Sequence, residues 1–249
     1  MKILVINPNI SESVTELIRD EAMRAALPDT RITTATAAFG VAYIETPGEA
    51  AVGGYAALTV LAEQYAGHDA AVIAAFGDPG VMAAKEIMPI PVVGLTEAAL
   101  ASAFLLGGRF AIVGISVRIG AWYCETVERL GLSSRFVGYR GLGQAFADVG
   151  TVHKEGQDML LELCLKCVAE GADTIILGGA PLAGVARQIR HLVPVPLVDG
   201  VGSAVRMAET LARSDYASRQ SGAFSPPPQK PQKGLPLPLS SLVGRTASL

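Results

Sequence analysis

The chain has 249 residues, 50% of them hydrophobic and 17% charged, with a formal net charge of −3. That composition can bury one large core or two modest ones, and the absence of a basic run argues against nucleic-acid binding. No apolar stretch reaches membrane-spanning length without interruption and no signal-peptide pattern precedes the first predicted strand, so we expect a cytoplasmic protein without a membrane partner.

The first half of the chain alternates apolar strands with helices. A strand over residues 2–7 is followed by helical periodicity over 13–26 and again over 48–64. An apolar strand then runs into the glycine-rich turn of residues 75–80, and a short strand follows at 90–94. Alternation of this kind predicts a parallel sheet covered by helices.

The second half repeats this order. A strand over residues 109–114 is followed by helical periodicity over 154–170. An apolar strand from residue 173 then enters a second glycine-rich turn, Gly178-Gly-Ala-Pro-Leu-Ala-Gly184, and another short strand follows at 195–199. The second half therefore has the elements of a second parallel sheet.

Three pairs of segments keep nearly one offset along the chain. The first strands are 107 residues apart, the turns at Ala75 and Gly179 are 104 apart, and the short strands at 90–94 and 195–199 are 105 apart. Two copies of one α/β unit with small loop insertions give this pattern. The sequence predicts two pseudo-symmetric Rossmann-like lobes, each a parallel sheet flanked by helices, with the ligand cleft between them.

The duplicated pattern also predicts where the two lobes begin and end. We expect the first lobe over residues 1–96, completed by about 200–215, and the second lobe over 97–199. Residues 219–249 are rich in proline, which can neither pair in a sheet nor continue a helix, and this predicts a disordered tail. A polyproline ligand for a partner domain is the alternative.

The three cysteines, Cys124, Cys164 and Cys167, are too few for a disulfide framework. The spacing of Cys164 and Cys167 fits a redox pair or half of a zinc site, but both fall in the middle of a predicted helix rather than at its start. A zinc site would need a second ligand pair. The histidines that could supply it are isolated: His68, His153 and His191. We therefore expect two core cysteines and no metal site.

Ligands of doubly wound folds collect at the carboxyl ends of the parallel strands. Asn7 and Asn9 follow the first strand, and their amides suit a carboxylate or a ring carbonyl, with a purely structural role in the turn as the alternative. Glycines in the two glycine-rich turns let backbone N–H groups approach an anion or an enolate oxygen. The residues expected to bind substrate are Asn7, Asn9, Phe76, Gly77, Ser116, Gly179 and Ala180.

Several motifs, in their order and spacing, resemble the aspartate/glutamate/hydantoin racemase superfamily, most closely its hydantoin and allantoin racemase branch. They are Ile6-Asn-Pro-Asn9, Tyr43-Ile-Glu-Thr46, Val72-Ile-Ala-Ala-Phe-Gly-Asp-Pro-Gly80, Pro91-Val-Val-Gly94, Ile175-Ile-Leu-Gly-Gly179 and Pro196-Leu-Val-Asp-Gly200. The resemblance covers about residues 1–213. It implies a cofactor-independent isomerase that exchanges a proton at a carbon next to a carbonyl, and assembly into a homo-oligomer.

In that family two cysteines, one per lobe, act as base and acid on opposite faces of the substrate. The resemblance places the first at Ala75 and the second at Gly179, so both thiols are absent. The family's threonine pair after the second lobe's first strand is replaced by Gly114 and Ile115, with Ser116 as the nearest hydroxyl. The residues around Gly179 also depart from the family pattern, which favours a natural variant over a protein whose two cysteines were mutated.

Three functions stay open. The first is a racemase or other isomerase of a hydantoin, allantoin or an amino acid that works without the thiol pair, with Asp78, Glu97 or Glu45 as candidate base. Asp78 is nearest to a thiol position, although a structural role in its motif is the alternative. The second is a lyase, such as a decarboxylase, that depends on enolate stabilisation. The third is a silent relative that binds a small ligand. We favour the first, with a small-molecule substrate and no cofactor.

Overall fold

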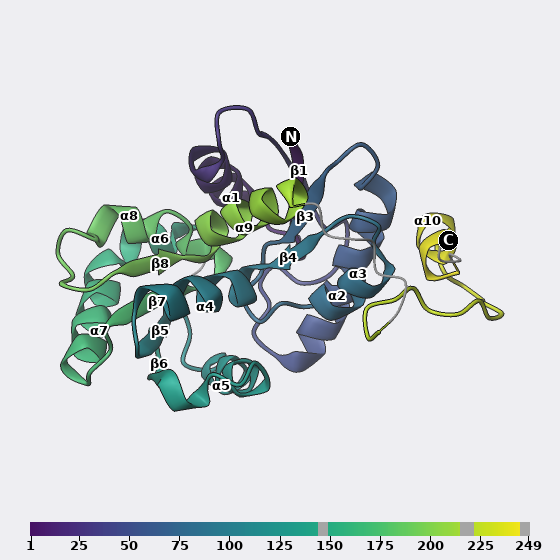
Figure 1. Cartoon of the computed structure of the whole chain (residues 1–249). Coiled ribbons are helices and arrows are strands. Elements are labelled where there is room, and N and C mark those ends of the chain that lie inside the picture. Colours follow the sequence, from purple (N-terminus) through teal and green to yellow (C-terminus); the bar gives the residue numbers. More distant parts are fainter. Residues whose placement is uncertain (144–148, 215–221, 245–249) are drawn as a thin grey trace.

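The computed structural model of the chain describes residues 1–143, 149–214 and 222–244, whose strands form two four-stranded parallel sheets (Figure 1). The first sheet, in the order β2-β1-β3-β4, contains β1 (Lys2–Asn7), β2 (Arg31–Thr36), β3 (Ala70–Ile73) and β4 (Val92–Gly94). The second, in the order β6-β5-β7-β8, contains β5 (Phe110–Gly114), β6 (Phe136–Gly141), β7 (Thr174–Gly178) and β8 (Leu197–Asp199).

Helices follow the strands in the expected alternation. In the first half they are α1 (Glu12–Ala25), α2 (Pro47–Gln64), α3 (Val81–Ile87) and α4 (Leu95–Leu106). In the second half they are α5 (Gly120–Arg129), α6 (Val152–Glu155), α7 (Gln157–Ala169), α8 (Val185–Ile189), α9 (Gly200–Arg213) and α10 (Leu237–Val243). Short 3-10 turns are η1 (Ser133–Arg135), η2 (Val149–Thr151) and η3 (Ala180–Leu182).

The two sheets share one strand order, which confirms the predicted two-lobed parallel α/β fold. The three offsets found in the sequence correspond to β1 with β5, β3 with β7, and β4 with β8. The sequence did not single out the fourth pair, β2 and β6, which form the equivalent edges of the two sheets. Both edge strands are largely half-exposed or exposed, so they lack the apolar run by which the buried strands were found.

Each sheet is covered on both faces. The inner strands β1, β3, β5 and β7 are almost entirely buried, as expected for parallel strands between helices. One apolar cluster, with side chains from α1, α4 and α9, runs through both lobes. Each lobe has a second cluster on its other face, and that of the second lobe includes Cys164 and Cys167. These two cysteines are core residues of α7, as predicted, and burial raises the pKa of Cys164 to about 12.

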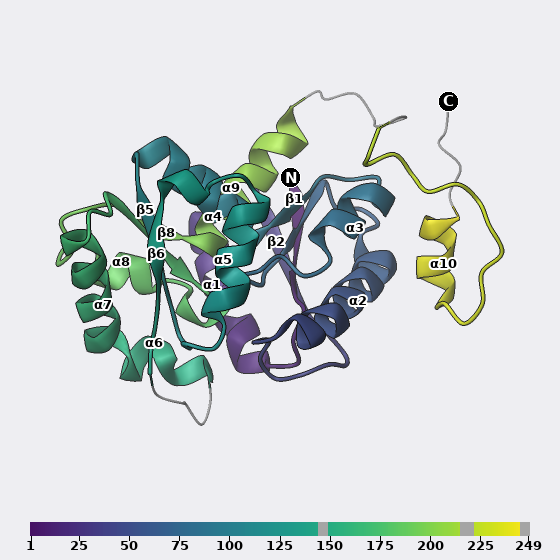
Figure 2. The ribbon, with the colours of Figure 1, turned by 90° about the horizontal axis from the view of Figure 1, so that it is seen from below.

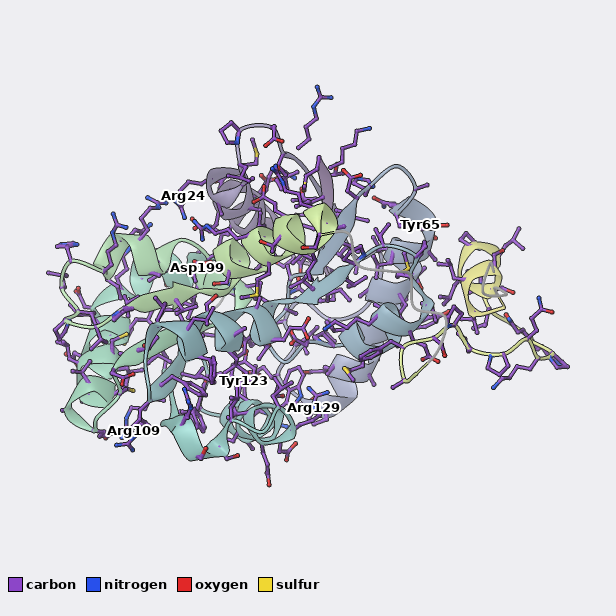
Figure 3. All side chains as sticks on the ribbon, in the orientation of Figure 1. Arg24, Tyr65, Arg109, Tyr123, Arg129 and Asp199 are labelled. Atoms are coloured by element: carbon purple, nitrogen blue, oxygen red, sulfur yellow. The ribbon has the colours of Figure 1, made fainter. Side chains whose placement is uncertain are left out.

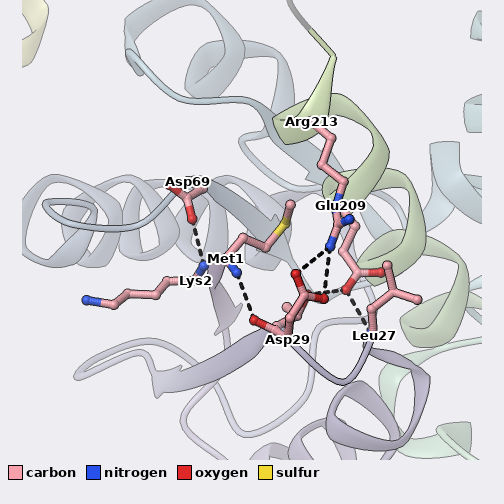
Figure 4. Close-up of polar contacts among 8 residues, drawn as sticks. Met1, Lys2, Leu27, Asp29, Asp69, Glu209 and Arg213 are labelled. Atoms are coloured by element: carbon pink, nitrogen blue, oxygen red, sulfur yellow. Dashed lines mark hydrogen bonds and ion pairs between the residues drawn. The ribbon is translucent and has the colours of Figure 1, made fainter.

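The helix that follows the last strand of each sheet crosses to the other sheet. α4 contacts β7 and β8, and α9 contacts β1, β3 and β4. Glu209 of α9 accepts hydrogen bonds from Leu27 N (2.9 Å) and Thr30 Oγ1 (2.5 Å), and Arg213 binds the carboxylate of Asp29 (2.9 Å) (Figure 4). We propose on this basis that residues 200–213 complete the first lobe.

The prediction of a disordered tail is wrong for residues 237–243, which form α10. Leu239 and Leu242 of this helix are buried in the apolar cluster of the first lobe, and α10 contacts α2. The Leu-Pro alternation of the tail offers no core of its own, so the helix depends on the apolar surface of α2. Residues 219–221 and 245–249 lie outside the described ranges.

α5 lies across the junction of the two lobes when the molecule is seen from below (Figure 2). Within the three described ranges, no helix combines the length and the apolar character needed to cross a lipid bilayer.

Candidate functional site

The two glycine-rich turns have the same outline and meet each other. Each ends on a glycine with positive φ, Gly80 at 78° and Gly184 at 81°, which starts α3 or α8. Phe76 of the first turn packs on Tyr123 of α5 with ring centroids 4.6 Å apart. A Cβ built at Gly178, the first residue of the second turn, would lie 3.5 Å from the Phe76 ring. The structure therefore brings the predicted residues Phe76 and Gly179 to one place.

Both turns present backbone N–H groups that find no acceptor in the described parts of the chain. Ala75, Phe76, Gly179 and Ala180 are all buried, and across the described residues none of their N–H groups has a hydrogen-bond acceptor. Buried backbone donors without a partner are rare, because each one loses its bond to water. Two such pairs, one from each lobe, are suited to hold a carbonyl or carboxylate oxygen.

The Gly77 N–H does not belong to this set. It donates to Thr96 Oγ1 at 2.6 Å, and a Cβ at Gly77 would overlap the ring of Trp122 from α5. The missing side chain of Gly77 leaves room for Trp122 to pack against the first turn, and the Gly77 N–H is hydrogen-bonded within the protein.

Asp78 and Glu97, two of the three candidate bases, organise the start of α4. The Asp78 carboxylate accepts hydrogen bonds from Thr96 N (2.7 Å) and Glu97 N (2.9 Å), and Glu97 in turn accepts from Gly94 N (3.0 Å) and pairs with Lys85. Burial raises the pKa of Asp78 to about 7, against the effect of its N–H donors and with help from the charge of Glu97. These contacts favour the structural role of Asp78.

Asn7 and Asn9 differ in how many of their amide groups are hydrogen-bonded within the protein. Asn7 Nδ2 donates to Asn9 Oδ1 (2.9 Å), Ser11 O (3.0 Å) and Thr15 Oγ1 (3.0 Å), and Asn7 Oδ1 accepts from Asn9 N (3.2 Å). The Asn7 amide is therefore fully engaged in the turn that leads into α1. Asn9 Oδ1 also accepts from Ser11 N (2.9 Å), but Asn9 Nδ2 donates to no described residue. Asn9 is the better candidate to bind a ligand.

A tyrosine cluster that sequence reasoning missed lies beside the turns. Tyr123 is 2% exposed, and its hydroxyl would be 3.9 Å from a Cβ at Gly179. Tyr139 Oη donates to the carbonyl oxygen of Ser116 (2.6 Å), while the buried Tyr43 Oη has no partner in the described structure. Burial, assisted by the negative charge of Glu45, raises the pKa of all three tyrosines above their usual range. They stay protonated at neutral pH.

The remaining predicted residue, Ser116, is half-buried at the edge of this cluster. Its hydroxyl accepts a hydrogen bond from Arg118 N (3.2 Å), so it shapes its own turn. The sequence signal for the cluster was the aromatic pair Trp122-Tyr123 on the helix after β5, together with the Tyr43-Ile-Glu45 motif. Neither pattern alone shows that the three tyrosines share one site.

Comparison with known proteins places this geometry in a family. The sequence profile described as Asp/Glu/Hydantoin racemase matches residues 3–208. The chain belongs to this family. A hydantoin racemase of Paenarthrobacter aurescens is 34% identical over 238 residues, covering 92% of this chain and 99% of that protein. An allantoin racemase structure from Klebsiella pneumoniae has a TM-score of 0.89 at 31% identity, with 96% and 98% of the two chains covered.

A less similar solved structure shares the architecture of this racemase family chain. The structure of an arylmalonate decarboxylase has a TM-score of 0.61 at 17% identity and covers 90% of this chain and 99% of that one. At that identity the likeness shows the fold alone.

The two positions that the family resemblance assigns to thiols differ in what they accept. Ala75 has no unusual backbone, whereas Gly179 has φ of 127° and ψ of 135°, a conformation that L residues rarely adopt. Cys124 is exposed on α5 and its thiol pKa is raised, chiefly by burial of part of the side chain, so it is not an activated nucleophile or base. In the described parts of the chain, no group of three or more His, Cys, Asp or Glu residues is arranged to hold a metal ion.

Proposed function

We propose that this racemase family member is a cofactor-independent isomerase that exchanges a proton at a carbon next to a carbonyl of a small amino-acid derivative, of the hydantoin or allantoin class, without a thiol pair. The observation that carries the proposal is the set of unpaired, buried N–H groups of Ala75, Phe76, Gly179 and Ala180. An enolate oxygen formed beside the α-carbon is the group that such donors stabilise. The names of its relatives, a hydantoin racemase and an allantoin racemase, support the substrate class.

The acid and the base come from different lobes in this proposal. Glu45 is half-buried, its carboxylate accepts no hydrogen bond from a described residue, and its charge reaches Tyr43, Tyr123 and Tyr139. Tyr123 is a protonated phenol beside Gly179, the second-lobe thiol position. The base and the acid of an inversion must approach the carbon from opposite faces, and two groups from facing lobes meet that requirement.

The proposed step conserves its protons. Glu45 takes the α-hydrogen as a proton, the electron pair of the broken C–H bond moves onto the carbonyl oxygen, and the backbone N–H groups stabilise the enolate. The Tyr123 hydroxyl then gives its proton to the other face of the carbon. A proton passes from Glu45 to the Tyr123 oxygen to restore both groups.

The absence of both thiols favours a second candidate, a silent relative that binds the same ligand and carries out no chemistry. Decarboxylation, which would consume the substrate, is a further reaction open to this fold. Proton NMR in deuterated water separates these functions, with single enantiomers of 5-substituted hydantoins, allantoin, aspartate, glutamate and substituted malonates as substrates. We expect loss of the α-proton signal of a hydantoin or allantoin with no new product.

Two variants and two matched controls test the assigned roles. Tyr123→Phe and Glu45→Gln should each slow proton exchange by a factor of about 100 or more, the usual contribution of a general acid or base. Tyr55→Phe and Glu63→Gln change exposed residues of α2 and should leave the rate unchanged. A new product peak would make the protein a lyase, and melting-temperature shifts without exchange would make it a binding protein.

We also propose a cytoplasmic location and a homo-oligomer. The end of α4 exposes three adjacent apolar residues, Phe104, Leu105 and Leu106, at 46%, 79% and 56%. A contiguous apolar surface of this kind is commonly covered by a second copy of the chain. Light scattering of the purified protein tests the assembly, and a monomeric mass at micromolar concentration would contradict it.

A further inference from the structure

A cavity of about 310 Å³ is lined in part by α4, and none of the three clustered tyrosines belongs to its wall. Arg24 and Asp199, which line it, and Tyr123 are seen on opposite sides of the α4 ribbon in Figure 3. The walls come from α1, α4, α8, β8 and α9, so the second sheet, through β8, and the two crossing helices contribute. The cavity is separate from the two glycine-rich turns.

The lining of this cavity is strongly basic. Four arginines line one space, one each from α1, α8 and α9 and one directly after α8, and two serines add hydroxyl groups. The residues are Arg24, Arg187, Arg190, Arg206, Ser102 and Ser203. Guanidinium groups present planar pairs of donors that match the oxygens of carboxylates and phosphates.

Only part of this charge is neutralised within the protein. Glu21, 3% exposed, accepts from Arg24 Nε at 2.8 Å and lies 4.0 Å from Arg187 Nε. The other carboxylate, Asp199, accepts from Gly184 N (2.7 Å) and Gly202 N (3.1 Å). No carboxylate of a described residue lies within ion-pair distance of the remaining two guanidinium groups, those of Arg190 and Arg206.

We propose that this cavity is a binding site for a small dianion that carries carboxylate or phosphate groups. Two uncompensated guanidinium groups match two negative charges, and the serine hydroxyls supply neutral donors at the cavity wall. The volume suits a compact ligand, at the lower end of the range for small-molecule sites. A dianion there would bridge Arg190, directly after α8, to Arg206 of α9, a helix that packs on the first sheet.

The proposed anion site is connected to the second glycine-rich turn through Asp199 and α8. Asp199 forms part of the cavity wall and accepts a hydrogen bond from the N–H of Gly184, the last residue of the turn that begins at Gly178. α8, which carries Arg187 and ends directly before Arg190, starts at the next residue. A bound dianion therefore fixes α8 against α9 and restrains the end of that turn.

The test measures binding directly and does not depend on catalytic activity. Inorganic phosphate, malonate and succinate are titrated into the full chain at constant ionic strength set with sodium chloride, and the melting temperature is recorded. A ligand that binds only the folded state raises this temperature by mass action, and we expect a saturable rise of roughly 3 °C or more for at least one dianion. The relative responses to phosphate and to the dicarboxylates show which group the site prefers.

Arg190→Gln combined with Arg206→Gln removes the two unpaired charges and should abolish the rise. The matched control is Arg129→Gln combined with Lys230→Gln, which removes two exposed charges outside the cavity and should keep it. Calorimetric titration of Arg190→Gln alone should show binding weakened about tenfold, the loss expected for one charge-assisted contact. An equal response in both double variants, or no response to any dianion above sodium chloride, overturns the proposal.

Discussion

The first and second glycine-rich turns are equivalent in backbone course but differ in what surrounds them. In the first, Thr96 accepts the Gly77 N–H and Trp122 packs against the turn. In the second, the residue two places after Gly179 is a proline, and Tyr123 presents its hydroxyl instead. Duplication has kept the N–H pairs of both turns, while the side chains around them make the two halves of the site chemically unequal.

This difference shows why symmetry of fold does not give symmetry of chemistry here. A pair of identical groups on opposite faces serves both directions of an inversion equally. In the proposed mechanism the base is a carboxylate from one lobe and the acid is a phenol from the other, with its pKa raised by burial, so the two groups are not interchangeable. We expect the rates from the two enantiomers of a substrate to differ in kcat and KM while the equilibrium stays unchanged.

The largest expected loss of stability comes from a substitution in the first turn. Gly77→Ala places a Cβ into the Trp122 ring at a φ of 98° and should destabilise the fold by about 3 kcal/mol. Gly67→Ala is the matched control, because Gly67 also has positive φ, 78°, but has open space around it. It should cost about 1 kcal/mol. Urea unfolding gives both values, and equal losses would show that Trp122 yields without cost.

The next largest effect is the difference in stability between a cysteine placed in the first turn and one placed in the second. Gly179→Cys forces an L residue into φ of 127° and should cost about 2 kcal/mol. Ala75→Cys adds only a sulfur at a buried position of ordinary backbone and should cost less than about 1 kcal/mol. Thermal unfolding of the two variants side by side measures the difference. If Gly179→Cys is the more stable of the two variants, the backbone of the second turn adjusts to an L residue at Gly179, and both turns accept a cysteine equally well.

A smaller loss of stability is expected when the carboxylate that caps a helix in either lobe, Asp78 or Asp199, is removed. Asp78→Ala leaves the N–H groups of Thr96 and Glu97 unpaired, and Asp199→Ala does the same to Gly184 and Gly202. Each change should lower the free energy of unfolding by about 1–2 kcal/mol. Equal losses in chemical denaturation would identify the two carboxylates as equivalent caps, whereas a negligible loss for Asp78→Ala would reopen its assignment as a catalytic base.

The finest difference between the lobes lies in their pH dependence. Burial raises the pKa of Asp78 to about 7 and that of Asp199 to about 6, from an ordinary 3.8. The folded protein then keeps protons that the unfolded chain releases, so each carboxyl lowers stability as pH rises from 3.8 to its folded pKa and has no further effect above it. Urea unfolding across this range should show that Asp78→Asn removes a slope reaching a higher pH than the slope removed by Asp199→Asn. Identical profiles would contradict the difference.

The fold was predictable where the signal was local. The buried strands are continuous apolar runs that repeat at one offset, and α1, α2 and α7 show helical periodicity close to their observed bounds. The edge strands β2 and β6 and the helix α10 were missed because their apolar residues are few or find a partner only in another element. The glycine-rich turns of the site were predicted, but Tyr123 and Trp122 were not, since α5 reaches the first turn only through the docking of the lobes.

The sequence by itself determined the duplicated α/β architecture, the two turns and the absence of cysteine at Ala75 and Gly179, because strand burial and glycine-rich turns leave a pattern in neighbouring residues. The tertiary structure alone decided which groups face those turns. Asp78 became a helix cap, three tyrosines from separate elements gathered beside Glu45, and four arginines came to line one cavity. Each of these depends on contacts between segments far apart in the chain, and no local periodicity encodes such contacts.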